Sequence, residues 1–247
     1  MLIVLETIIP AAVIFAYIRH KDSYWKEKPR KLIFGVVGLI MGLMIFDSVT
    51  DVLWDWSFFD LFECPFSEDS RLYLLCHCFV TVATPEEFLK FLVLIVMTWK
   101  HPAFSHRFDG IVFSAMSSLG FATLENFTYM LKDEENLIVA IMRAVSSMPC
   151  HVAFGVLMGL FYAKAKEASL QHQKHLVFRN FLLALVIPIL MHGLYNFTAL
   201  SESFLVSFCL GLIITLEEIA IAIYIIRKQA KDNPAFVTES LDIPQTL

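Results

Sequence analysis

Long apolar segments alternate with short polar segments along almost the whole chain. A bilayer core about 30 Å thick takes roughly 20 residues of helix. Because backbone groups cannot stay unpaired in lipid, and barrel strands have only about ten residues, each long apolar run is expected to be an α-helix. The pattern predicts an all-α, polytopic membrane helix bundle of about seven transmembrane helices. The predicted spans cover approximately residues 1–18, 32–54, 72–98, 110–131, 137–163, 177–200 and 203–227.

The composition agrees with a membrane protein. Of the 247 residues, 57% are hydrophobic and only 17% are charged, whereas about 25% of the residues of a soluble protein are charged. The net charge of -5 leaves no basic surface for a polyanion, so nucleic acid is excluded as a partner. The five cysteines form no CxxC pair and no disulfide framework. The expected surroundings are therefore a lipid bilayer.

The positive residues predict the orientation, because cytoplasmic loops carry an excess of Lys and Arg. Fifteen of them lie in segments on one side of the predicted bundle, six of these within residues 19–31, and two lie on the other side. The N-terminus is therefore expected outside and the C-terminus in the cytoplasm. Residues 1–227 are predicted to form a single transmembrane domain, and residues 228–247 a disordered cytoplasmic tail. The predicted localisation is an integral, multi-pass membrane protein, in the cytoplasmic membrane if the source is bacterial.

Ionisable side chains inside the spans are candidates for function, because a charge near the bilayer centre costs at least about 2.5 kcal/mol. They lie in five spans together with two asparagines. The set consists of Glu86, Glu87 and Lys90 in the third span, Glu125 and Asn126 in the fourth, Arg143 and His151 in the fifth, His192 and Asn196 in the sixth, and Glu217 and Glu218 in the seventh.

Counting from the outer ends of the spans places four of these residues in the outer half of the membrane. At 1.5 Å per residue, Glu86 and His151 lie about 14 residues deep, His192 about 8 and Glu125 about 6. If the four helices are neighbours, these side chains share one cavity in the outer half of the membrane. The alternative is that the carboxylates form structural ion pairs with Lys90 and Arg143.

Local spacing suggests how the groups are oriented. Pro85 removes a backbone donor, so the third helix is expected to kink just before the glutamates. Glu86 and Lys90 stand at i,i+4 on one helix face, whereas Glu87 projects about 100° away. His192 and Asn196 are also at i,i+4, so Asn196 is expected to hold one imidazole nitrogen of His192.

Four motifs in this chain, taken in order, resemble the PrsW family of intramembrane proteases, which is similar to the group that includes the CAAX prenyl proteases. The motifs are EEFLK beginning at Glu86, FATLEN ending at Asn126, HVAFG beginning at His151 and HGLYN beginning at His192. The resemblance covers about residues 80–200. It implies an endopeptidase that hydrolyses membrane-anchored protein or peptide substrates with an activated water.

The resemblance also implies roles for single residues. Glu86 would be the general base, Glu87 and Lys90 a supporting pair, and His192 with Asn196 would position water or polarise the scissile carbonyl. The CAAX-type enzymes have a His where this chain has Glu125. His151 is the candidate to replace that missing imidazole.

A metal site is an open alternative to a metal-free Glu/His mechanism. Three nitrogen or oxygen ligands with one open position are the catalytic pattern for zinc. His151, His192 and Glu125 are the candidate ligands, although the chain contains no HExxH motif. The residues expected to take part in catalysis are Glu86, Glu87, Glu125, His151 and His192, supported by Lys90, Asn126 and Asn196.

A proton- or ion-coupled membrane transporter is the main alternative function, because Glu and His within spans are also typical of proton relays. Glu217 and Glu218 favour it, since no protease motif uses them. The absence of an inverted repeat in the sequence argues against transport. A receptor-like seven-helix bundle is a third alternative, but it does not require a Glu/His cluster.

Overall fold

The computed structural model describes residues 7–23, 64–67, 69–132 and 137–236, and all regular elements in these ranges are helical. The all-α prediction is therefore confirmed for this part of the chain. The elements are α1 (Ile9–Lys21), α3 (Arg71–Cys76), η3 (His77–Ala83), α4 (Thr84–Thr98), α5 (Arg107–Lys132), α6 (Leu137–Met142), η4 (Arg143–Ser147), α7 (Met148–Leu170), α8 (Lys174–Ala199), η5 (Leu205–Leu210) and α9 (Gly211–Lys231), where η marks π-helical segments.

Six of the seven predicted spans correspond to these helices, and the predicted span 32–54 lies outside the described residues. The third span is α3, η3 and α4 in one continuous run. The fifth span contains η4 between α6 and α7, and the seventh begins with η5. Three runs in the described part of the chain are long and apolar enough to cross a membrane, namely Leu137–Leu170, Lys174–Ala199 and Leu205–Lys231. The count of seven helices and the orientation of the termini stay predictions.

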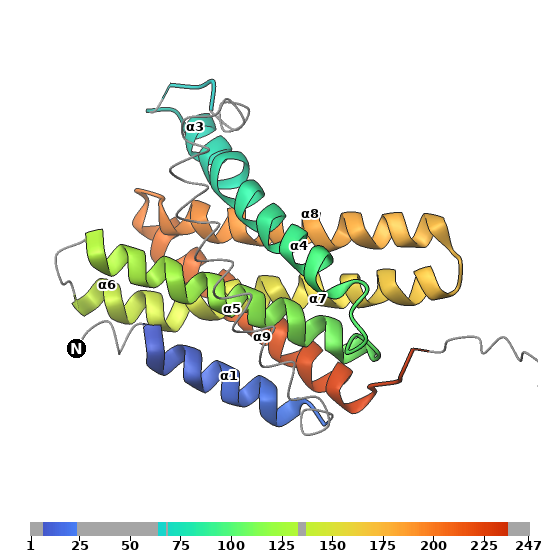
Figure 1. Ribbon diagram of the computed structural model, residues 1–247. Coiled ribbons are helices and arrows are strands. Elements are labelled where there is room, and N and C mark those ends of the chain that lie inside the picture. The colour runs from blue at the N-terminus through green and yellow to red at the C-terminus, as the bar shows by residue number, and fades with distance from the viewer. Residues whose placement is uncertain (1–6, 24–63, 68, 133–136, 237–247) are drawn as a thin grey trace, which may run out of the picture.

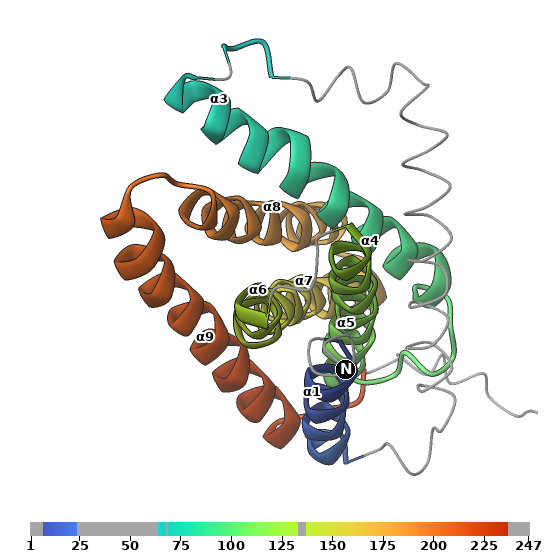
Figure 2. The same ribbon diagram turned by 90° about the vertical axis from the view of Figure 1, so that its left-hand side faces the viewer.

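Helix α7 lies at the centre of the bundle and packs against α5, α8 and α9 (Figure 2). Its buried residues include His151, Phe154, Tyr162 and almost every position between 148 and 159. A helix that is buried on all sides needs no polar face, which explains why residues 148–163 are almost entirely apolar apart from His151. One polar side chain on this helix, His151, is therefore enclosed by protein.

Small residues bring α5 and α7 into close contact. Gly155 and Gly159 stand one turn apart on α7 and face α5. A Cβ atom on Gly159 would lie 2.5 Å from the carbonyl oxygen of Gly110 and 2.6 Å from the Cα atom of Ile111. Small residues four apart are the usual means by which two membrane helices approach each other at the backbone.

Two of the π-helical segments end two residues before a proline. Segment η3 precedes Pro85, and η4 precedes Pro149. The hydroxyl of Thr84 donates a hydrogen bond to the carbonyl oxygen of Phe79, at 2.7 Å. The irregularity expected at Pro85 thus takes the form of a π-helical stretch, a feature that is frequent at functional sites.

The helix ends that carry the Lys- and Arg-rich segments lie toward one end of the bundle, on the right in Figure 1. These are the ends of α1, α4, α7 and α9 and the starts of α5 and α8. The side chains of Arg107 on α5 and Glu167 on α7 form an ion pair there. The grouping of these segments on one side agrees with the charge pattern of the sequence.

The described part of the C-terminal segment packs against the bundle. Helix α9 continues to Lys231, and the residues after it pack against the start of α5. The backbone N–H of Phe236 donates to the carbonyl oxygen of Ser105 at 2.8 Å, and the ring of Phe236 meets the edge of Phe104. These contacts satisfy backbone groups and partly bury an aromatic ring, so they hold the described residues after α9 against the bundle. Residues 237–247 lie outside the described residues.

Candidate active site

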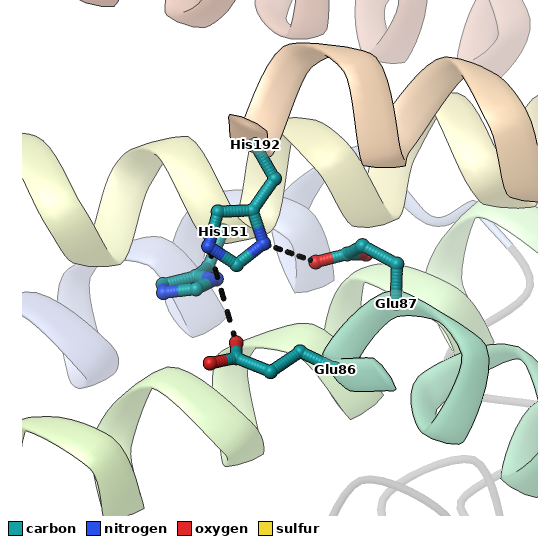
Figure 3. Close-up of side chains that lie close together, drawn as sticks. All are labelled: Glu86, Glu87, His151 and His192. Carbon is teal, nitrogen blue, oxygen red and sulfur yellow. Dashed lines mark hydrogen bonds and ion pairs between the residues drawn. The ribbon is translucent and has the colours of Figure 1, made fainter. Parts of the chain in front are cut away.

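Four polar side chains from three helices converge inside the bundle (Figure 3). Glu86 and Glu87 come from α4, His151 from α7 and His192 from α8. One potential ligand atom from each residue lies within 4.8 Å of the corresponding atoms of the other three. We call these residues the Glu/His cluster. Glu87, His151 and His192 are buried, and the side chain of Glu86 keeps 17% of its surface exposed.

The two glutamates face the two ring nitrogens of His192. Nδ1 of His192 lies 2.9 Å from Oε1 of Glu87, and Nε2 lies 3.9 Å from Oε2 of Glu86. Because a carboxylate accepts hydrogen bonds, the contact with Glu87 favours the tautomer that carries its proton on Nδ1. The expectation that Asn196 holds an imidazole nitrogen is therefore wrong, and Glu87 takes that position.

Lys90 lies among the same groups. Its Nζ atom donates to Oε1 of Glu87 at 2.6 Å and lies 3.8 Å from Oε2 of Glu86. The same atom lies 3.1 Å from Nδ1 of His151 and 4.1 Å from the centre of the Phe121 ring. The sequence suggested an i,i+4 pair with Glu86, but the closer partner is Glu87 at i,i+3. Lys90 thus places a positive charge between the two glutamates.

Glu125 lies behind His151 instead of inside the Glu/His cluster. Its Oε2 atom is 2.7 Å from Nε2 of His151, and its Oε1 atom is 3.2 Å from a terminal nitrogen of Arg143. Arg143 in turn donates from Nε to Oδ1 of Asn126 at 3.1 Å. A proton on Nε2 of His151 is favoured by this carboxylate, so the lone pair of Nδ1 points toward the cluster. The predicted ligand Glu125 is thus on the far side of the imidazole from the other candidates.

Two aromatic rings, from the FATLEN and HVAFG motifs, hold the two imidazoles. The ring of Phe154 stacks on His192 with centroids 5.1 Å apart, and the ring of Phe121 meets His151 edge-on at 5.7 Å. The two imidazoles are 4.9 Å apart and nearly perpendicular. Phe154 follows His151 by three residues on the same helix face, which is the sequence signal that would have indicated it.

The donor atoms of the Glu/His cluster fit a divalent metal ion. Oε2 of Glu86 and Oε2 of Glu87 are buried and have no hydrogen-bond partner in the described part of the chain. A buried carboxylate oxygen without a partner is costly, so these atoms are suited to a further ligand. Two imidazole nitrogens and carboxylate oxygens are a set that zinc accepts. The residues present therefore fit a zinc site.

The two remaining intramembrane carboxylates lie outside this cluster. Glu218 is buried beside Cys150 on α7, and Glu217 is exposed on the outer side of α9. Asn126 supports Arg143 as described, whereas Asn196 is half-buried one turn after His192. The site therefore consists of the Glu/His cluster, Lys90 inside it, and Glu125 with Arg143 behind His151.

A helical bundle with helices long and apolar enough to cross a membrane, and with a buried cluster of carboxylates and imidazoles, is compatible with the class of membrane-embedded hydrolases. A match to a known protein family supports this class. Residues 28–224 match the family described as PrsW family intramembrane metalloprotease. The chain belongs to this family, and it is an intramembrane protease. The resemblance noted at the four motifs is therefore confirmed.

Curated proteins similar to this chain are named Protease PrsW. The chain is 35% identical over 202 residues to Protease PrsW of Clostridioides difficile strain 630, covering 80% of this chain and 79% of the relative. It is 31% identical over 191 residues to Protease PrsW of Oceanobacillus iheyensis, covering 77% and 79%. It is 41% identical over 120 residues to Protease PrsW of Bacillus subtilis strain 168, covering 47% and 52%. No solved structure matches. These relatives do not favour the transporter alternative.

Proposed function

We propose that this chain is an endopeptidase that cleaves membrane-anchored proteins or peptides at the Glu/His cluster. The observation that carries the proposal is the convergence of Glu86, Glu87, His151 and His192, from three helices, to within 4.8 Å of one another. A substrate anchored in the membrane is the one that can reach a site enclosed by membrane helices. Since the named relatives are bacterial, we propose the cytoplasmic membrane as the location.

Glu86 is proposed as the general base. It is the more accessible of the two glutamates, and its Oε2 atom has no hydrogen-bond partner in the described residues. A carboxylate with a free oxygen can take a proton from water and return it to the leaving amine. Oε2 of Glu87 also has no hydrogen-bond partner in the described residues, but the side chain of Glu87 is fully buried and its Oε1 atom is bonded to Lys90 and His192, so Glu86 is the better placed of the two to meet water.

Glu87, His151 and His192 are proposed to hold a zinc ion. When bound, the ion would polarise the scissile carbonyl and help to generate the attacking hydroxide. Three protein ligands leave a position for water or substrate, which is the arrangement of catalytic zinc sites. Lys90 contacts Glu87 and His151, so it balances the negative charge of the cluster when no metal is bound.

Glu125 is proposed to act through His151. A carboxylate on the outer nitrogen of a metal-binding imidazole fixes its tautomer and raises its basicity. Arg143 holds the other oxygen of Glu125 and is itself bonded to Asn126. Asn196, one turn after His192, is proposed as a hydrogen-bonding group for the substrate backbone.

The test uses the full chain reconstituted in lipid vesicles with single-span reporter peptides. Cleavage is followed by mass spectrometry for the wild type, for Glu86→Gln, and for the matched control Glu202→Gln, whose carboxylate is exposed between α8 and η5. We expect Glu86→Gln to abolish cleavage while the folded protein persists, and Glu202→Gln to cleave like the wild type. Unchanged cleavage by Glu86→Gln would refute its role as base.

A second arm tests the metal. The wild type is treated with a chelator and then supplied with Zn²⁺. We expect loss of cleavage with the chelator and recovery with zinc. Full activity after the metal content has fallen to zero, measured by plasma mass spectrometry, would remove zinc from the proposal and leave a metal-free Glu/His mechanism.

A further inference from the structure

Helix α9 presents a regular row of exposed side chains to the outside of the bundle. The row follows a spacing of three and four residues, and each member is exposed. We call this row the α9 seam. It consists of Leu210 at the end of η5 and of Ile213, Glu217, Ala220 and Tyr224 on α9. Alternating steps of three and four residues are the pattern by which one helix packs along another, and a small residue such as Ala220 permits close approach.

Glu217 lies in the middle of the membrane-crossing length of this helix. It follows Leu205 by twelve residues and precedes Arg227 by ten, so it is about 15–18 Å from each end at 1.5 Å per residue. The next residue, Glu218, points inward and lies beside Cys150, which directly precedes His151. Glu217 is therefore near the depth of the Glu/His cluster, but it projects about 100° away from Glu218 around α9 and is exposed.

An exposed carboxylate at this depth needs a partner. Glu217 makes no hydrogen bond or ion pair within the described part of the chain, and its neighbours along the seam are apolar. Lipid cannot solvate an ionised carboxylate, and intramembrane acidic groups pair with cations or line hydrated cavities. A single polar group at the centre of an otherwise apolar seam also selects its partner, because only a complementary group can oppose it.

We propose that the α9 seam docks the transmembrane helix of the substrate, and that it selects helices carrying a Lys or Arg at mid-membrane depth. The inference rests on the proposed function for the identity of the docked helix as substrate. Charge complementarity argues against other occupants. A second copy would bring Glu217 toward an identical carboxylate. The predicted span at residues 32–54 of this chain has Asp47 and Asp51 as its ionisable residues, so it offers no cation.

The test measures binding separately from cleavage. Glu86→Gln protein in lipid vesicles is mixed with synthetic membrane-spanning helices that carry Lys or Leu at the central position. Binding is followed by energy transfer between labelled partners. We expect the Lys helix to bind at least about tenfold more tightly than the Leu helix. This preference should vanish when Glu217→Gln is added and persist when Glu202→Gln is added. Equal binding of the two helices, or a preference unchanged by Glu217→Gln, would overturn the proposal.

A photo-reactive amino acid at position 220 identifies the occupant directly. We expect it to cross-link to the Lys helix and not to the Leu helix. Cross-linking to a second copy, or to residues 32–54 of the same chain, would contradict the proposal. Selective binding without any cleavage by the wild type would count against the proposed function alone. Cleavage that is independent of Glu217 would count against the docking surface alone.

Discussion

At the scale of single residues, the site is a network of buried charges in which Lys90 has the central place. Its Nζ atom contacts Glu87, Glu86 and His151 from a position that is almost fully buried. A buried ion pair is stable because both charges are present, and removal of one leaves the other unsolvated. Lys90 therefore contributes to stability and to the charge balance of the cluster.

Replacing Lys90 with Met should destabilise the metal-free protein by about 3–5 kcal/mol, because the carboxylate of Glu87 loses its compensating charge. Thermal unfolding in detergent, after treatment with a chelator, measures this as a lower melting temperature. Added zinc should restore part of the loss, since a cation again balances the glutamates. Lys100→Met, at an exposed position, is the control. An unchanged melting temperature for Lys90→Met would contradict the assigned role.

Replacing Glu125 with Gln tests the group behind His151. Loss of a carboxylate that orients a metal-binding imidazole commonly lowers metal affinity about 10–100-fold. We expect a drop of this size in zinc affinity, measured by competition with a fluorescent chelator, with little change in helical content by circular dichroism. Glu202→Gln serves again as the control. If Glu125→Gln binds zinc like the wild type, Glu125 does not act through His151.

At the scale of helices, the close contact of α5 with α7 determines where His151 lies. The atoms nearest to a Cβ on Gly159 are backbone atoms of Gly110 and Ile111, which cannot move aside as a side chain can. The same α7 helix carries His151 two turns earlier. The spacing of these two helices is therefore coupled to the geometry of the site.

Gly159→Ala should separate α5 from α7 and cost about 1–3 kcal/mol or more, as overpacking does in other tightly packed interiors. We expect a lower melting temperature together with reduced cleavage, because His151 is displaced from the glutamates. The control is Gly211→Ala, where a Cβ would lie 3.3–3.4 Å from the Thr198 side chain and 3.7 Å from the nearest backbone atom, the carbonyl oxygen of Val206. Equal stability of the two variants would show that the interface is more adaptable than the contacts indicate.

At the scale of the whole molecule, the charge pattern predicts which end of the bundle faces the cytoplasm. Gln171 lies between α7 and α8, at the Lys- and Arg-rich end, and Ser203 lies between α8 and η5, at the other end. Single cysteines at these two exposed positions, in a Cys209→Ser background, can be labelled with a membrane-impermeant maleimide. We expect Ser203→Cys to react in intact cells and Gln171→Cys to react only after permeabilisation. The reverse result would invert the topology.

Much of the fold was predictable because it depends on a property that is local in the sequence. A run of about 20 apolar residues must be helical in lipid whatever its neighbours are, and six predicted spans agree with helices to within several residues. The candidate residues Glu86, Glu87, His151 and His192 were predictable for a similar reason, since any ionisable residue at such depth is costly. Which side chains these residues pair with was not predictable from the sequence, as Asn196 illustrates. Its i,i+4 spacing to His192 is local, but the partner of His192 is Glu87, 105 residues away in the chain.

The amino-acid sequence by itself determined that the chain is a helical membrane protein, which polar residues enter the membrane, and which family motifs they form. Only the tertiary structure decided that Lys90 binds Glu87 more closely than Glu86, that Glu125 stands behind His151, and that Glu217 is exposed while Glu218 is buried. The physical reason is that the entry of a segment into a bilayer depends on the apolar residues of that segment alone, so the sequence is enough to predict it. The partner of a buried charge depends on how helices far apart in the chain pack together, and here small residues and proline-associated irregularities control that packing.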